Sequence, residues 1–250
     1  MDGVDLNRNW GHNFSGGADP RRSPCVGTFY GAAPFSEPES RALRDLIQAN
    51  PGIDTHIDFH SFGQLVLRPW SFTENKTNVP PREASNCGVG NAMGDAMTSR
   101  HGLPYNVTHG TFLYTVGGTM TDWVASQNIL SYTIELRPSM HGVDKPAFLL
   151  PEDEILPTCQ EGFEAVKTLL RFASDPDSFD NKCVRATPPT DPGSSPNELE
   201  PGGSAVDWGF VFGLAGGGGL FVVLLVMIVI VSRRSRHTSP PPEHLRSGNG

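Results

Sequence analysis

Two segments of the sequence carry ionisable side chains at positions where a buried strand is normally apolar. His56, Asp58 and His60 alternate within residues 53–60, so a strand there turns all three to one face. Glu135 closes the otherwise apolar run Tyr-Thr-Ile-Glu-Leu. Burying such a carboxylate costs several kcal/mol unless it is paired or has a role. Each residue alone is compatible with a structural role, whereas the two histidines and the aspartate on one strand face are also compatible with a metal site.

The rest of the folded region must position these strands. Apolar residues recur with helical or strand spacing, and Ser36-Glu-Pro-Glu39 has the form of a capping box at the start of a helix. Strands that alternate with helices predict an α/β domain. The expected elements are a helix from the capping box to Asn50, strands at 53–60, 64–67 and 129–136, helices at 84–100 and 122–127, and a last amphipathic helix marked by Phe163, Val166, Leu169 and Leu170.

Six motifs occur in order between Val4 and about Phe172. They are Asp5-Leu-Asn-Arg-Asn-Trp10, Asp58-Phe-His-Ser-Phe-Gly-Gln-Leu65, Thr111-Phe-Leu-Tyr114, Gly117-Gly-Thr-Met-Thr-Asp-Trp123, Tyr132-Thr-Ile-Glu-Leu-Arg137 and Phe148-Leu-Leu-Pro151. Their order resembles the zinc carboxypeptidases of the carboxypeptidase A/B type, the M14 metallopeptidases. The resemblance implies the C-terminal portion of a three-layer α/β/α fold with a mixed sheet. It also implies that peptide or protein C-termini are the substrates.

The resemblance assigns substrate-binding roles to four residues. Asn7 and Arg8 match the pair that binds the substrate's C-terminal carboxylate, and a planar guanidinium suits this task because it can donate two parallel hydrogen bonds. Tyr114 matches the mobile tyrosine that closes over the terminal residue. Ser61 lies at a position that lines the substrate cleft.

The pocket for the terminal side chain is expected to be lined in part by Ser71, Met120 and Thr121. None of the three is acidic, so we expect a preference for terminal residues other than Lys and Arg. A basic terminal residue would require a carboxylate in that pocket.

The catalytic set is only partly present. His60 matches the third zinc ligand, and Glu135 matches the general base that takes a proton from zinc-bound water. The family's other two ligands form a His-x-x-Glu motif, and none of the eight His residues has Glu three positions later. Because a catalytic zinc normally has three protein ligands, we expect an N-terminally incomplete copy with little or no peptidase activity of its own.

Three hypotheses follow for the function. The first is a metallocarboxypeptidase, which the presence of Glu135 and Tyr114 favours because a pure binder needs no general base. The second is an inactive module that binds C-terminal carboxylates through Asn7 and Arg8. The third, independent of the family, is a metal site made by His56-x-Asp-x-His60 on one strand face.

Charge and hydropathy divide the chain. Of its 250 residues, those at 208–232 include no charged side chain, which predicts a single transmembrane helix. The tail at 233–250 is basic, so the positive-inside rule places it in the cytosol and the catalytic part outside, as in a type I membrane protein. Residues 1–207 carry 15 basic and 26 acidic side chains, an acidity that excludes nucleic acid as a partner. We expect the folded domain at 1–173 and a Pro-rich linker at 174–207.

Sequons and cysteines fit a lumenal or extracellular domain. Asn13, Asn75 and Asn106 begin Asn-x-Ser/Thr triplets, which predict a glycoprotein. In the resembling family, the residue matching Cys25 pairs with a cysteine that would fall near Met1, which leaves the other three cysteines as an odd set.

Overall fold

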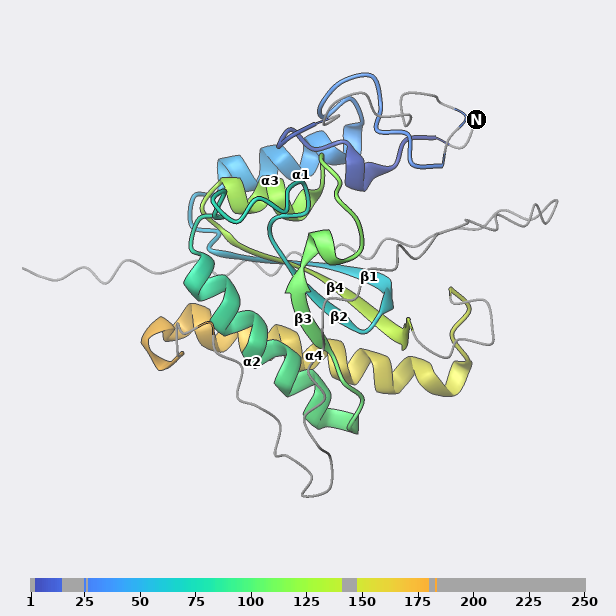
Figure 1. Ribbon diagram of the computed structural model, residues 1–250, viewed down its shortest axis with the longest axis vertical. Helices are drawn as coiled ribbons and strands as arrows, with labels where there is room; N and C mark the ends of the chain where they lie inside the picture. Colours follow the sequence, from blue (N-terminus) through green and yellow to red (C-terminus); the bar gives the residue numbers. More distant parts are fainter. Residues whose placement is uncertain (1–2, 15–24, 26, 141–147, 180–182, 184–250) are drawn as a thin grey trace, which may run out of the picture.

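A mixed sheet forms the centre of the chain. The computed structural model describes residues 3–14, 25, 27–140, 148–179 and 183, and in these residues the strand order is β1-β4-β2-β3 (Figure 1). The strands are β1 (Thr55–Gly63), β2 (Leu65–Arg68), β3 (Asn106–His109) and β4 (Leu130–Ser139). β4 runs parallel to β1 and antiparallel to β2, while β2 and β3 are parallel. The expected mixed sheet is therefore confirmed.

Helices cover both faces of this sheet (Figure 1). On one face lie α1 (Pro38–Ala49) and α3 (Met120–Ser126), and on the other lie α2 (Glu83–His101) and α4 (Glu152–Ser174). Within the residues that the structure describes, three short 3-10 helices complete the elements: η1 (Leu6–Arg8), η3 (Gly110–Phe112) and η4 (Pro176–Ser178). The result is the three-layer α/β/α arrangement, with one apolar cluster between each helical layer and the sheet.

The parallel pairing of β1 with β4 decides where the ionisable residues meet. Their register sets His60 beside Glu135 and Asp58 beside Thr133. Two strands that the sequence separates by about 70 residues thus bring their polar ends to one edge of the sheet. This edge holds the candidate site.

The elements differ from the expected ones at three points. β3 was not expected, because only one of its four residues, Val107, is strongly apolar. α4 begins at Glu152, eleven residues before the first of its predicted apolar markers. The capping box is wrong: Glu37 is the N-cap and makes no side-chain cap bond, while Ser36 Oγ donates to Glu37 Oε1 instead.

The cysteine pairing is partly settled. Cys87 in α2 forms a disulfide with Cys183, beyond the end of α4. Cys159 in α4 has an exposed free thiol. The three sequon asparagines are exposed, and their glycosylation stays a prediction. No helix within the described ranges is long and apolar enough to cross a membrane; the predicted span at 208–232 lies outside them.

A buried ionic cluster fixes α4 against the end of β4. Glu161 is fully buried, and both of its carboxylate oxygens accept hydrogen bonds from the Arg137 guanidinium. Tyr105 Oη donates a third bond to Glu161 at 2.9 Å. Arg137 also pairs with Glu154 in the first turn of α4. Because Arg137 lies two residues after Glu135 on β4, this cluster anchors the strand that carries Glu135.

Glu161→Ala is expected to lower the free energy of unfolding by about 3–5 kcal/mol, because it leaves the buried Arg137 charge without its main partner. Glu164→Ala, on the same helix but in a surface pair with Lys167, is the matched control and should cost no more than about 1 kcal/mol. Urea denaturation of both variants measures the difference. Equal costs would contradict a stabilising role for the buried cluster.

Candidate active site

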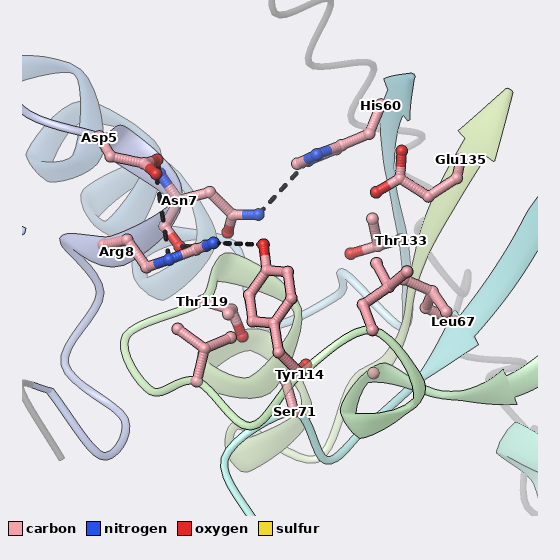
Figure 2. A pocket seen from close by; sticks show the side chains of 13 residues that line it. Asp5, Asn7, Arg8, His60, Leu67, Ser71, Tyr114, Thr119, Thr133 and Glu135 are labelled. Atoms are coloured by element: carbon pink, nitrogen blue, oxygen red, sulfur yellow. Dashed lines mark hydrogen bonds and ion pairs between the residues drawn. The ribbon is translucent and has the colours of Figure 1, made fainter. Parts of the chain in front are cut away.

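A cavity of about 180 Å³ opens where η1 meets the polar ends of β1 and β4. Figure 2 shows Asn7 and Arg8 on one side of it, His60 and Glu135 on the opposite side, and Tyr114 between them. The structure thus brings the expected carboxylate-binding pair, the third-ligand histidine, the general base and the mobile tyrosine together around one cavity. The remaining walls are Asp5, Leu67, Ser71, Gly110, Leu113, Val116, Thr119 and Thr133.

Arg8 is held in the cavity wall by its own short helix and by Tyr114. The Asp5 carboxylate caps η1 by accepting from the Asn7 N–H at 2.9 Å, and it lies 3.9 Å from Arg8 Nε. Arg8 Nη1 donates to the Asn7 carbonyl and Nη2 to Tyr114 Oη, both at 2.7 Å. Arg8 is buried, whereas Tyr114 is half exposed at the mouth. A buried guanidinium therefore faces the cavity beneath an accessible phenol.

Asn7 connects the two sides of the cavity. Its Oδ1 accepts a hydrogen bond of 2.8 Å from the Met120 N–H at the start of α3. That bond points the amide nitrogen toward the opposite wall, where Nδ2 lies 3.5 Å from His60 Nε2. The hydrogen bond from the Met120 backbone therefore orients the Asn7 side chain, and its Nδ2 donor is directed into the cavity.

The opposite wall carries the ionisable pair. His60 Nε2 lies 2.8 Å from Asp58 Oδ2, and Asp58 is fully buried behind it. Burial lowers the pKa of His60, but its hydrogen bond to Asp58 and the charges of Asp58 and Glu135 outweigh that effect, so the pKa is raised overall. Burial raises the pKa of Glu135 to about 7, and the negative charge of Asp58 adds to the rise. Glu135 can therefore exchange a proton near neutral pH.

This arrangement agrees with the comparison to known families. Residues 1–165 match the zinc carboxypeptidase family. The chain belongs to this family. Carboxypeptidase B of Astacus astacus is 35% identical over 179 residues, which cover 69% of this chain and 56% of that protein. Human carboxypeptidase O is 37% identical over 172 residues, covering 67% and 44% of the two chains.

Solved carboxypeptidase structures share the fold. Bovine thrombin-activatable fibrinolysis inhibitor, solved in complex with tick carboxypeptidase inhibitor, aligns with a TM-score of 0.60 at 32% identity, over 67% of this chain and 55% of that one. Carboxypeptidase A of Helicoverpa armigera aligns with a TM-score of 0.59 at 30% identity, over 68% and 41%. The chain spans about half the length of the relatives that it matches.

The carboxypeptidase family implies a zinc ion, and the described residues do not complete a site for one. They contain no group of three or more His, Cys, Asp or Glu side chains that could hold a metal ion. The hypothesis of a metal site at His56-x-Asp-x-His60 is therefore wrong. His56 is fully buried, with Nδ1 2.9 Å from Ser131 Oγ, and burial lowers its pKa to about 4. His60 is the one imidazole among the described residues that line the cavity.

Ser61, Thr121 and Met120, which were expected around the substrate, lie outside the cavity wall. Ser61 is exposed, because the alternation of β1 turns its side chain away from the face that carries His60. Thr121 is buried behind the wall, where its hydroxyl is hydrogen-bonded to that of Thr133. Of the other residues expected in the side-chain pocket, Ser71 lines the cavity, while Met120 lines a neighbouring one.

Sequence reasoning missed Asp122, which is fully buried and hydrogen-bonded to Ser71 of the cavity wall. Both of its carboxylate oxygens accept from the Ser71 N–H, at 3.0 and 2.9 Å. Asp122 lies in the first turn of α3, where an acidic side chain normally interacts with the helix dipole at the protein surface. The sequence therefore gave no indication that this carboxylate is buried. Burial raises the pKa of Asp122 to about 7, although its hydrogen bonds with Ser71 oppose the shift.

Asp122→Asn is expected to flatten the dependence of stability on pH between about 4 and 7. The folded carboxyl has a pKa of about 7, above the value of about 3.9 of an unfolded chain. In that interval the folded state holds a proton that the unfolded state releases, so the free energy of unfolding falls as pH rises. Asn keeps an acceptor for the Ser71 N–H but has no such proton. Urea denaturation across this pH range measures the slope, and an unchanged slope would contradict the shift.

Proposed function

We propose that the cavity binds the C-terminal carboxylate of peptides and that the chain takes part in removing their last residue as a metallocarboxypeptidase. The observation that carries the proposal is the Arg8 guanidinium, buried in the cavity wall. Two of its five N–H donors make the described hydrogen bonds to the Asn7 carbonyl and to Tyr114 Oη, so donors remain for a ligand. A guanidinium that lines a cavity and keeps such donors is suited to bind a carboxylate.

The other side chains supply the remaining steps. Asn7 Nδ2 donates a further hydrogen bond to the bound carboxylate, and Tyr114 at the mouth covers the terminal residue. Glu135 takes a proton from the attacking water and passes it to the departing amine, a role that a pKa near 7 supports. Zinc, when bound, supplies Lewis-acid activation. His60 gives it one ligand, so hydrolysis requires ligands beyond the described residues.

The wall chemistry supports a preference for terminal residues that carry no positive charge. Leu67, Ser71 and Thr133 are neutral, and the acidic Asp5 lies beside Arg8 and caps η1. Apart from Glu135 and from Asp5, which already interacts with Arg8 and η1, the described cavity wall offers no acidic side chain to a terminal Lys or Arg. Peptides that differ only in their last residue test this point.

The second candidate function is a C-terminal-binding module without catalysis. The single imidazole at the cavity favours it, since a zinc ion held by one ligand binds weakly. The two functions share carboxylate binding and differ in turnover. Both predict that a peptide with a free C-terminus binds and that its C-terminal amide does not.

The test uses the full chain with added zinc and a fluorescent peptide offered as the free acid and as the amide. Preferential binding of the acid with release of the last residue supports the carboxypeptidase. Preferential binding without release, and without bound zinc by elemental analysis, supports the module. Equal binding of acid and amide would overturn both.

We further propose that the chain is a type I membrane protein with its catalytic part outside the cytosol. The charge-free segment at 208–232 and the basic tail support this orientation. The Cys87–Cys183 disulfide supports it too, because such bonds persist in oxidising compartments. Digestion of sealed vesicles by an external protease tests it: the domain should be protected in vesicles whose interior is lumenal. Protection of the tail instead would contradict it.

A further inference from the structure

α4 presents an apolar stripe to solvent. Leu156 and Phe163, two turns apart on the helix, are 66% and 59% exposed, and the free thiol of Cys159 lies between them. The inward face of α4, which includes the fully buried Leu169, packs in the core between the helices and the sheet. Within the described ranges, the Lys167 ammonium nitrogen lies 5.6 Å from the centroid of the Phe163 ring, yet both apolar side chains stay more than half exposed. Exposing two large apolar side chains on one face is unfavourable.

Charged residues bracket this stripe in a symmetric pattern. Glu152 is exposed in the first turn of α4, and Lys167 is partly exposed one turn beyond Phe163. Steps of four, seven and four residues keep Glu152, Leu156, Phe163 and Lys167 on one face. Their order is acid, apolar, apolar, base. The midpoint of both the outer and the inner pair falls between Cys159 and Gln160.

A second, antiparallel copy of the helix matches this pattern. With a two-fold axis through that midpoint, each Leu156 faces Phe163 of the other copy, and each Glu152 faces its Lys167. The same patch thus serves both copies, which is the requirement for a closed dimer. Each contact occurs twice, so the pairing joins opposite charges at both ends and apolar groups at the centre.

We propose that this face of α4 is the contact surface of a homodimer of the chain. A second copy fits better than a membrane surface, because the first turn holds Glu152, Asp153 and Glu154, and anionic lipids repel such a cluster. Helices pack with axes about 8–10 Å apart. Two Cys159 residues flanking the axis then have Cα atoms about 4–6 Å apart, within the range of a disulfide.

Cys159 therefore serves as a position reporter in the experiment. The full chain, in detergent and in reconstituted bilayers, is treated with oxidised glutathione. This small disulfide accepts the two electrons as two Cys159 thiols lose two protons and join, and it leaves as two thiols. We expect a disulfide-linked dimer that Cys159→Ser abolishes. The proposal would be overturned if the chain sedimented as a monomer in detergent and gave no disulfide-linked dimer in either medium.

Three variants test the register. Phe163→Glu should lower the cross-linking rate at least about tenfold, since it puts a charge into an apolar contact, whereas Val79→Glu, equally exposed at 60% but off α4, should leave it unchanged. Glu152→Lys or Lys167→Glu alone should lower the rate at least about threefold, and the two together should restore it. Failure of the double reversal to restore cross-linking would overturn the antiparallel pairing. So would an unchanged cross-linking rate in Phe163→Glu, which would leave the apolar stripe to another occupant.

Discussion

Arg8→Gln is expected to weaken binding of a peptide with a free C-terminus at least about 30-fold. Removing one partner of a buried, hydrogen-bonded charge pair costs about 2–5 kcal/mol, and each 1.4 kcal/mol is about tenfold in affinity. The loss should be confined to the carboxylate, because Arg8 contacts Asn7, Tyr114 and Asp5 but no other part of the cavity wall by a hydrogen bond or ion pair that the structure describes. Fluorescence titration with the acid and amide forms of one peptide measures the effect.

Two further variants make this result specific. Arg100→Gln makes the same substitution at an exposed site on α2 and should leave binding unchanged. Arg8→Lys keeps the charge but loses the planar fork, so it should lie between the parent and Arg8→Gln. Circular dichroism checks that each variant is folded. If Arg8→Gln weakened the amide as much as the acid, Arg8 would not be the carboxylate-binding residue.

Glu135→Gln is expected to lower turnover at least about 100-fold while changing the peptide Kd by less than about threefold. A positioned general base contributes about 10²–10⁴ to the rate, and Gln keeps the shape of the side chain but accepts no proton. The assay is release of the last residue by the full chain with added zinc. In the parent, kcat/KM should rise with pH up to about 7, the pKa to which burial raises Glu135, because the carboxylate is the active form.

The control for this variant is Glu39→Gln on α1, an exposed carboxylate whose loss should leave turnover unchanged. Retained turnover in Glu135→Gln would remove Glu135 from the base role. A rise of Kd in proportion to the loss of turnover would instead mean that Glu135 binds substrate rather than moving a proton.

The polar faces of the strands could be predicted from the sequence, because which side chains share a face depends only on local periodicity. Alternation placed Asp58 and His60 on one face, and the structure pairs them at 2.8 Å. The juxtaposition of His60 with Glu135 depends on how β1 and β4 pair, which no local pattern encodes. It entered the sequence reasoning only through the family resemblance.

The misses have the same physical origin. Nothing next to Asp122 in sequence indicates its burial, which comes from the backbone of Ser71, fifty-one residues away. Thr121 was expected in the pocket wall, but its hydroxyl turns to Thr133 on the neighbouring strand. β3 is held in the sheet by pairing with β2, so its own four residues carry little signal. Tertiary contacts, rather than periodicity, decide all three.

The Cys87–Cys183 bond has a consequence for a cleaved molecule. The bond joins two cysteines that are 96 residues apart in the sequence, so the chain between them forms a covalent ring. Phe112 and Tyr114, whose side chains are exposed, lie within that ring. A protease that cuts beside them separates Arg8 and His60 from Glu135 in the chain but not in the molecule. The nicked product remains one species on a non-reducing gel and falls into two pieces only after reduction, so the cavity keeps both of its walls.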